Sequence, residues 1–409
     1  MYRQSLYNRT VRTLELPPPD PDARAASDRL ALRIAERIAA AGGRIGFDAF
    51  MQAALYEPGL GYYSGGARKF GPAGDFVTAP EISPLFGACL AAQCDEWFAH
   101  APAVVHEFGA GSGALAADLL AELERRGRPP EAYRIVEVSG ELRARQRDTI
   151  AARAPSMLAR VEWLDAWPER LDGVVLGNEL LDAMPARVFR LAGGDVLERG
   201  VAVAAEVEGV PRFGWADAPA DAAFAQRVRA LLADVIAQAG EHWPQEYVGE
   251  VGEQALAWVR EAAARMHRGA LLLLDYGFPR HELYHPQRVA GTLMCHYRHH
   301  AHVDPFLLPG LQDVTVHVDF TGVALAGVDA GLELLGYTSQ ARLLLNLGLL
   351  ETLARTPVGQ GLAYARQAQS VQTLVSEAEM GELFKAIALG RGMPPEAAGF
   401  LRGDRSASL

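Results

Sequence analysis

A glycine-rich turn that follows an apolar stretch is the part of the sequence best suited to bind a ligand. Its glycines are Gly109, Gly111 and Gly113. Glycines let the backbone pass close under a ligand and supply the positive φ angles that a tight turn needs. With Ala114, the turn also satisfies the dinucleotide pattern G-x-G-x-x-G/A. The spacing alone leaves open several nucleotide-like ligands, and also a tight turn that binds nothing.

Two carboxylates near this turn narrow the choice of ligand. Glu107 lies two residues before Gly109, where its charge would repel a pyrophosphate and suit a cationic or hydroxyl-bearing ligand. Glu137 ends the next expected strand, where a carboxylate can accept hydrogen bonds from both ribose hydroxyls. Because NAD and S-adenosylmethionine both contain a ribose, Glu137 fits either cofactor.

Short apolar strands alternate with helical patterns around these residues. This alternation predicts an α/β fold with a doubly wound parallel sheet, whose ligands bind at the carboxyl ends of the strands. The expected strands are 103–108, 133–138, 161–165, 173–177 and 270–274, and the expected helices include 114–126 and 141–152.

The flanking segments predict further elements. Ser27 starts a helix that carries Leu30 and Ile34 on one face, and 59–87 is a candidate binding loop rich in glycine and aromatic residues. The other expectations are a hairpin of 186–191 and 196–207, helices at 222–238 and 253–267, a helical pattern from about 340 onward and a frayed tail at 399–409.

Five motifs, taken in order, resemble the MidA-like family of class I S-adenosylmethionine-dependent methyltransferases. The motifs are Arg68–Glu81, Glu107–Gly113 with Glu137, Gly177–Pro185, Asp275–Gly277 and His317–Thr321. The resemblance runs from about residue 46 to the C-terminal segment. The family includes the mitochondrial complex I assembly factor that methylates an arginine of a core complex I subunit.

The resemblance implies a Rossmann-like methyltransferase sheet with an N-terminal helical cap and an inserted, discontinuous substrate-binding subdomain. It implies S-adenosyl-L-methionine as cofactor and S-adenosyl-L-homocysteine as product. The implied division places the cap and a cofactor-covering loop in 1–102, the core in 103–191 and 266–409, and the inserted regions in 192–265 and 280–330.

The resemblance also implies which residues bind the cofactor. They are Gly74, Asp75 and Phe76 in a covering loop, Glu107, Gly109, Gly111 and Gly113 in the floor, Glu137 at the ribose, Asp165 at the adenine amino group and Asn178 near the transferred methyl. For Asp165, a position in a surface turn is the alternative.

An arginine acceptor would need carboxylates, because a guanidinium is always protonated and must be held by its fork of N–H groups. Glu179 and Asp182 are three residues apart and meet if the segment is helical or tightly turned. We expect this catalytic pair to hold the guanidinium and take its proton, with a cap role for Asp182 as the alternative. Asp319 is a further catalytic candidate. The candidate substrate-binding residues are Asp275, Tyr276, Arg298, His317 and Phe320, of which Tyr276 and Phe320 could stack on the cation.

Composition and one further motif exclude other classes of function. With 39 Lys and Arg against 50 Asp and Glu, the net charge of −11 argues against a chain-wide grip on nucleic acid or anionic lipid. No apolar stretch reaches the length that predicts membrane insertion. The segment His281–His285 fits H-E-x-x-H, but Pro279 and Pro286 leave little room for the helix that a zinc site needs, so we expect no metal.

Three functions stay open on the sequence. The first is protein-arginine N-methylation of a complex I core subunit during assembly, in the bacterial cytoplasm, or in the mitochondrial matrix if the source is eukaryotic. The second is a non-enzymatic assembly chaperone that binds S-adenosylmethionine, and the third is a NAD-dependent oxidoreductase. Three cysteines without C-x-x-C spacing indicate a reducing compartment. The sequence is also compatible with a homodimer.

Overall fold

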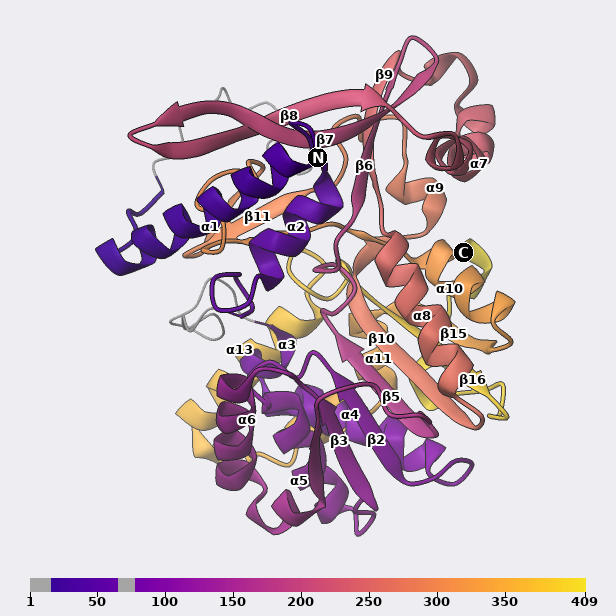
Figure 1. Ribbon diagram of the computed structural model, residues 1–409. Helices are drawn as coiled ribbons and strands as arrows, with labels where there is room; N and C mark the ends of the chain where they lie inside the picture. The colour runs from indigo at the N-terminus through magenta and orange to yellow at the C-terminus, as the bar shows by residue number, and fades with distance from the viewer. Residues whose placement is uncertain (1–15, 65–77) are drawn as a thin grey trace.

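The computed structural model describes residues 16–64 and 78–409, which are built around an eight-stranded sheet (Figure 1). In order across the sheet, the strands are β15 (Glu333–Ser339), β16 (Phe384–Arg391), β10 (Gly269–Phe278), β5 (Gly173–Asn178), β2 (Val104–Phe108), β3 (Ala132–Val136) and β4 (Val161–Leu164), with β14 (Val318–Asp319) beside β10. From β10 to β4 all neighbours are parallel. The predicted doubly wound α/β class is confirmed.

The register of the parallel strands brings their carboxyl ends to one edge of the sheet. Phe108 of β2 pairs with Val136 of β3 and with Gly177 of β5, and Asn178 pairs with Leu274 of β10. The segments that follow these strands therefore start side by side. They carry most of the side chains for which the sequence predicts a function.

Helices cover both faces of this sheet, because alternate residues of a strand point to opposite faces. Leu272 and Leu274 of β10 share a core with one set of helices, and Leu271 and Leu273 share a core with the other. The first set is α4 (Pro84–Trp97), α5 (Ala114–Arg125), α11 (Gln340–Asn346), α12 (Leu349–Leu353) and α13 (Leu362–Val375). The second set is α8 (Glu253–Arg265) and α10 (Phe320–Asp329).

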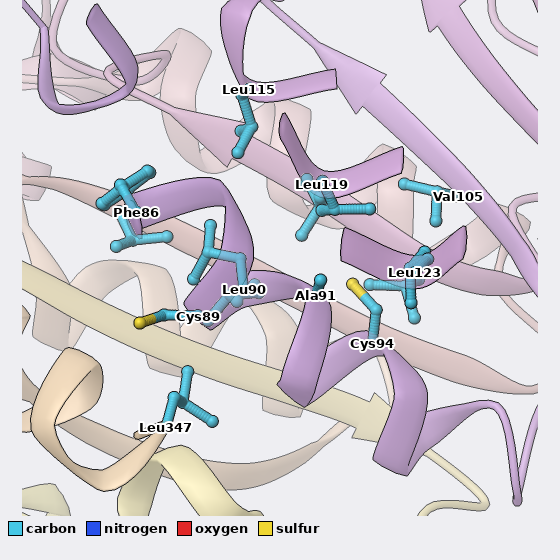
Figure 2. Close-up of a cluster of buried hydrophobic side chains, with 14 of the residues drawn as sticks. Phe86, Cys89, Leu90, Ala91, Cys94, Val105, Leu115, Leu119, Leu123 and Leu347 are labelled. Atoms are coloured by element: carbon cyan, nitrogen blue, oxygen red, sulfur yellow. The ribbon is translucent and has the colours of Figure 1, made fainter. Parts of the chain in front are cut away.

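The first core is closely packed, as Figure 2 shows. Leu90 and Cys94 of α4 lie near Leu119 and Leu123 of α5 in this view, and all four are fully buried. All three cysteines are free and buried, so in this protein they act as small apolar side chains.

A second, five-stranded antiparallel sheet lies at the other end of the molecule, at the top of Figure 1. It consists of β1 (Ile45–Gly46), β7 (Asp195–Val207), β6 (Arg187–Ala192) and β9 (Glu246–Val251), with β8 (Val210–Pro219) beside β7. The predicted hairpin is confirmed as β6 and β7. Residues 187–191, which the expected division placed in the core, belong instead to this sheet because they pair with β7 and β9.

The N-terminal helices pack on this second sheet. Ile34 of α1 (Pro21–Ala40) and Phe50 of α2 (Phe47–Tyr56) share one apolar core with Val201 of β7. The helix α7 (Ala222–Ala239) packs elsewhere on the same sheet through a separate core. A third sheet joins β12 (His300–His302), β11 (Met294–Tyr297) and β13 (Asp313–Thr315).

The remaining helices are α3 (Ala79–Ile82), α6 (Gly140–Arg153) and α9 (Arg280–Leu283), with short 3-10 helices at Pro155–Arg160, Gly240–His242, Val358–Gln360, Ala398–Phe400 and Ser406–Ser408. Ala79 of α3 and Ile150 of α6 belong to the first core. Within the described ranges, no helix is both long and apolar enough to cross a bilayer.

The C-terminal region differs from the expected helical pattern. Phe384–Arg391 is a central strand that pairs antiparallel with both β10 and β15. A short strand buried on both faces is continuously apolar, and periodicity cannot distinguish it from a buried helix. The expected strand 270–274 likewise continues to Phe278.

The expected frayed tail is also wrong. The backbone N–H of Arg405 donates to the Tyr337 carbonyl, at 2.6 Å, and the Asp404 carboxylate accepts from the Tyr337 N–H, at 3.0 Å. Phe400 is buried and packs over Gly336, where an added Cβ would lie 2.3 Å from the ring. The tail therefore completes the packing of β15.

This packing predicts a stability difference between two adjacent residues. Phe400→Ala should lower the free energy of unfolding by about 3–5 kcal/mol, because it leaves a cavity in the core. Leu401, which is 64% exposed, is the matched control. Leu401→Ala should change the free energy of unfolding by no more than about 0.5 kcal/mol. Urea unfolding followed by tryptophan fluorescence measures both values, and equal effects would contradict a packed tail.

Candidate functional site

A cavity of about 750 Å³ opens at the carboxyl edge of the central sheet. Its walls come from four parts of the chain that are far apart in sequence. They are the turn after α2, the glycine turn after β2, the loop after β3 and the turn after β5, completed by α3, Tyr276 and Asp313. Ligands of doubly wound folds bind at this edge.

The glycine turn forms one wall of the cavity. Gly109, Gly111 and Gly113 have φ angles of 71°, 51° and 82°, which lie in the left-handed region. A Cβ at Gly113 would also lie 2.9 Å from the Cα of Gln146. The turn therefore needs glycine for its backbone and for its approach to α6. Gly109 and Gly111 line the cavity directly, whereas Gly113, which was also expected in the floor, does not.

Glu107 lies at the base of this wall. Its carboxylate accepts a hydrogen bond from the Tyr133 hydroxyl, at 2.7 Å, and its side chain is almost fully buried. Burial raises the pKa of Glu107 to about 7, because a charged carboxylate is disfavoured away from water. A cationic ligand at this point would favour the ionised form and gain a charge partner.

Glu137 lies on the adjoining wall. Gln146, which the sequence did not single out, helps to orient its carboxylate. The Glu137 carboxylate accepts from the Ser139 N–H, at 2.8 Å, and from the Gln146 side-chain amide, at 3.3 Å. The same amide nitrogen donates to the Gly111 carbonyl, at 3.1 Å. Gln146 thus ties the carboxylate to the glycine turn. A polar residue in a helix carries no sequence signal for such a role.

The turn after β5 carries Glu179 and Asp182 into the cavity. Glu179 has a φ of 49°, which is unusual for a residue other than glycine. One oxygen of the Asp275 carboxylate holds the turn, accepting from the N–H groups of Leu180, Leu181 and Asp182 at 3.1, 2.8 and 3.3 Å. Asp275 does not line the cavity. We predicted that it contacts substrate, but it supports the turn instead.

Three carboxylates and three tyrosines lie together at one end of the cavity. They are Glu179, Asp182, Asp313, Tyr56, Tyr63 and Tyr276. We call this group the acceptor chamber. The Tyr63 hydroxyl donates to Asp313, at 2.9 Å, and the Tyr56 hydroxyl donates to the Ala183 carbonyl, at 3.0 Å. The Tyr276 hydroxyl hydrogen-bonds to Asp182.

The environment of these carboxylates shifts their protonation. Burial, followed by the nearby charge of Asp182, raises the pKa of Glu179 to about 8. Burial raises the pKa of Asp182 to about 6. Perturbed carboxyl groups in a cavity are typical of functional sites. A bound cation would shift both groups toward their ionised forms.

Tyr56, Tyr63 and Asp313 were not predicted as site residues from the sequence. Tyr63 lies within the predicted binding loop, but Asp313 is 250 residues further along the chain and carries no motif. Only the packing of the third sheet against the N-terminal helices brings the two side chains together.

Several predicted site residues lie elsewhere. Asp319 caps α10 by accepting from the Gly322 N–H, at 3.0 Å, and pairs with Arg280. Because those partners occupy its carboxylate and it does not line the cavity, it cannot hold the acceptor. Phe320 is buried against Tyr337 in the core of the sheet.

The other predicted residues outside the cavity also have local partners. His317 is half-buried and stacked on Phe278, and desolvation lowers its pKa to about 3. Arg298 is a surface residue that donates to the Pro18 carbonyl, at 3.1 Å. The exposed Asp165 forms an ion pair with Arg143, at 2.7 Å. This position matches the alternative of a surface residue and not the expected contact with the adenine amino group. None of these three lines the cavity.

Two further predictions concern the covering loop and the histidine motif. The covering-loop residues Gly74, Asp75 and Phe76 lie outside the described residues. In the H-E-x-x-H segment, α9 ends at Leu283, so His285 lies beyond the helix that would align it with His281. In the parts of the chain that the structure describes, no three His, Cys, Asp or Glu side chains are placed so that they could hold one metal ion together.

The cavity fits S-adenosylmethionine better than a dinucleotide. Among its described lining residues none is Lys, Arg or His, so a pyrophosphate would find no cationic partner there. Glu107 and Glu137 are placed for a cationic, ribose-bearing ligand. The buried side-chain oxygen of Asn178 has no hydrogen-bond partner among the described residues and is free to bind one.

Known proteins resemble this chain over most of its length. A family model described as "Putative S-adenosyl-L-methionine-dependent methyltransferase" matches residues 89–338. A crystal structure from Burkholderia thailandensis bound to S-adenosyl-homocysteine is 50% identical, with a TM-score of 0.90, and covers 96% of this chain and 100% of its own. A native crystal structure from the same organism is 49% identical, with a TM-score of 0.87 and the same coverage.

More distant relatives come from animals. The "Protein arginine methyltransferase NDUFAF7, mitochondrial" of Danio rerio is 27% identical over 84% of this chain and 82% of its own length. The homologue from Drosophila melanogaster is 27% identical over 84% of this chain and 81% of its own. S-adenosylmethionine is thereby confirmed as the cofactor, in place of NAD. With its fold, its cavity and these relatives, the chain belongs to the MidA-like family of class I S-adenosylmethionine-dependent methyltransferases.

Proposed function

We propose that this methyltransferase modifies an arginine side chain of a protein, and that its client is a respiratory complex I core subunit during assembly. The observation that carries the arginine assignment is the charge of the acceptor chamber. Glu179, Asp182 and Asp313 converge there, and no described cavity residue offers a positive charge. A neutral acceptor would leave Glu179 and Asp182 without a cationic partner among the described lining residues, whereas a cation would pair with them.

The relatives support the same assignment. The animal proteins carry the name protein arginine methyltransferase and match more than four-fifths of this chain. The assignment of the client as a complex I subunit is supported by the resemblance to a family that includes a complex I assembly factor.

The chain's residues would position the acceptor and receive its proton. When bound, S-adenosylmethionine supplies a methyl group activated by its positively charged sulfur. Glu179 and Asp182, on one turn fixed by Asp275, would hold two edges of the guanidinium and leave one nitrogen facing that methyl. The raised pKa of Glu179 makes it the stronger base of the pair. We therefore assign to Glu179 the proton that leaves the methylated nitrogen.

Neutral variants of the pair test these roles. Glu179→Gln and Asp182→Asn should each lower kcat/KM for methyl transfer by about 100-fold or more, because each removes a charge that holds or deprotonates the acceptor. Affinity for S-adenosylhomocysteine, measured by calorimetry, should stay close to that of the wild type. Asp329→Asn, at the exposed end of α10, is the matched control. Full activity of both variants would refute the roles.

The raised pKa values predict the pH dependence of the reaction. Glu179 and Asp182 must be ionised to pair with a guanidinium, and their pKa values are about 8 and about 6. The guanidinium does not titrate in this range. The methyl-transfer rate at saturating cofactor should therefore rise with pH between about 6 and 8. A rate that is flat or falls over this range would contradict ionised carboxylates at the acceptor.

The client can be tested in cells. Complex I subunits purified from cells with this protein should be heavier by one or more methylene units than those from cells without it, and fragmentation should place the added mass on an arginine. Cells that carry the Glu179→Gln variant should resemble the deletion. If complex I assembles normally with this variant but fails in the deletion, the required role is a chaperone role and not methylation.

A further inference from the structure

We propose that Asp313, held by Tyr63, is the residue by which this site selects a guanidinium over an ammonium group. The inference rests on the proposed arginine methylation and adds a specificity-determining carboxylate to it. Glu179 and Asp182 come from one turn of the methyltransferase core, whereas Asp313 comes from β13 of the third sheet. The acceptor would thus be held from two sides by different parts of the fold.

Backbone contacts fix where Asp313 lies relative to the catalytic turn. The N–H of Val316, three residues after Asp313, donates to the carbonyl of Asp182, at 3.0 Å. The third sheet is therefore joined directly to the turn that carries Glu179 and Asp182. Asp313 is 2% exposed and lines the same cavity as both of them.

Tyr63 orients the Asp313 carboxylate from a third part of the chain. Its hydroxyl donates to one Asp313 oxygen, at 2.9 Å, and its backbone N–H donates to the Leu55 carbonyl of α2, at 2.8 Å. This fold-back passes through Gly61, where a Cβ would lie 2.4 Å from the Glu57 nitrogen. Burial and the charge of Asp313 hold the pKa of Tyr63 well above its usual value, so the hydroxyl remains a donor.

The shape of the chamber also favours a planar cation. The rings of Tyr56 and Tyr63 are stacked, with centroids 5.5 Å apart and an interplanar angle of 24°. Aromatic faces and carboxylates on several sides match a guanidinium, which is flat and presents N–H donors along three edges. An ammonium is a compact, strongly hydrated charge with three donors and would leave at least one carboxylate poorly paired.

The experiment uses the purified full-length protein and, as acceptor, a hypomethylated lysate from cells that lack it. Methyl transfer from radiolabelled S-adenosylmethionine is followed by hydrolysis and separate measurement of methylarginine and methyllysine. In Asp313→Asn, the rate of methylarginine formation should fall by about tenfold or more, because a charge-assisted hydrogen bond is lost. Methyllysine should not fall with it. Affinity for S-adenosylhomocysteine should be unchanged.

Two variants make the result decisive. Asp304→Asn, an exposed residue of the same inserted region, is the matched control and should leave the rate unaltered. Tyr63→Phe removes the hydroxyl that donates to Asp313 and leaves the Val314 N–H donating to the same oxygen, so it should lower the methylarginine rate only severalfold. If Asp313→Asn fails to bind S-adenosylhomocysteine, its lower rate has a second cause. The methylarginine rate of Tyr63→Phe then decides whether Asp313 acts on the acceptor.

The outcomes separate this inference from the function on which it rests. A wild-type protein that forms no methylarginine would overturn the proposed function itself. A wild-type protein that forms methylarginine, with unchanged rates in Asp313→Asn and Tyr63→Phe, would overturn only the role of Asp313. An equal fall in methylarginine and methyllysine would show that Asp313 binds any cation and does not select between them.

Discussion

The site depends on one buried carboxylate that contacts no cavity directly. Three consecutive N–H groups of the turn after β5 donate to a single oxygen of Asp275. This arrangement fixes a turn in which Glu179 adopts a left-handed backbone conformation, at a cost that the surrounding hydrogen bonds must offset. Asp275 can reach the turn because β10 lies beside β5 in register, with Leu274 opposite Asn178. The parallel pairing of two strands thus positions Glu179 and Asp182 at the cavity.

A second constraint is electrostatic. The cavity gathers several buried carboxylates without a described basic residue, and burial raises the pKa values of Glu107, Glu179 and Asp182. Carboxylates in such a place are stable when protonated or when a cation joins them. Such a cavity favours ligands that carry positive charge, such as the sulfonium of the cofactor, and the proposed arginine acceptor would add a second charge. The free energy of pairing those charges is available for binding and alignment.

Motifs allowed the cofactor half of the site to be predicted from sequence. Glu107 lies near the end of β2, and the glycine turn and Glu137 directly follow β2 and β3, so local pattern and the edge of a parallel sheet together place them. The acceptor half was predicted only in part. Glu179 and Asp182 are close in sequence and both line the cavity, whereas Asp319 and His317 have local roles as a cap and as a packed ring. Tyr63 and Asp313 were missed as partners because their contact spans 250 residues.

The sequence by itself determined the α/β class, the parallel core, the cofactor and the family, because these follow from short-range periodicity and from motifs carried by contiguous residues. Only the tertiary structure decided that Phe384–Arg391 is a central strand, since burial on both faces removes the periodicity that would reveal it. It likewise decided which polar side chains meet at the acceptor. Hydrogen bonds such as those of Asp275 and Asp313 join distant segments, and no local pattern records which segments will become neighbours when the layers pack.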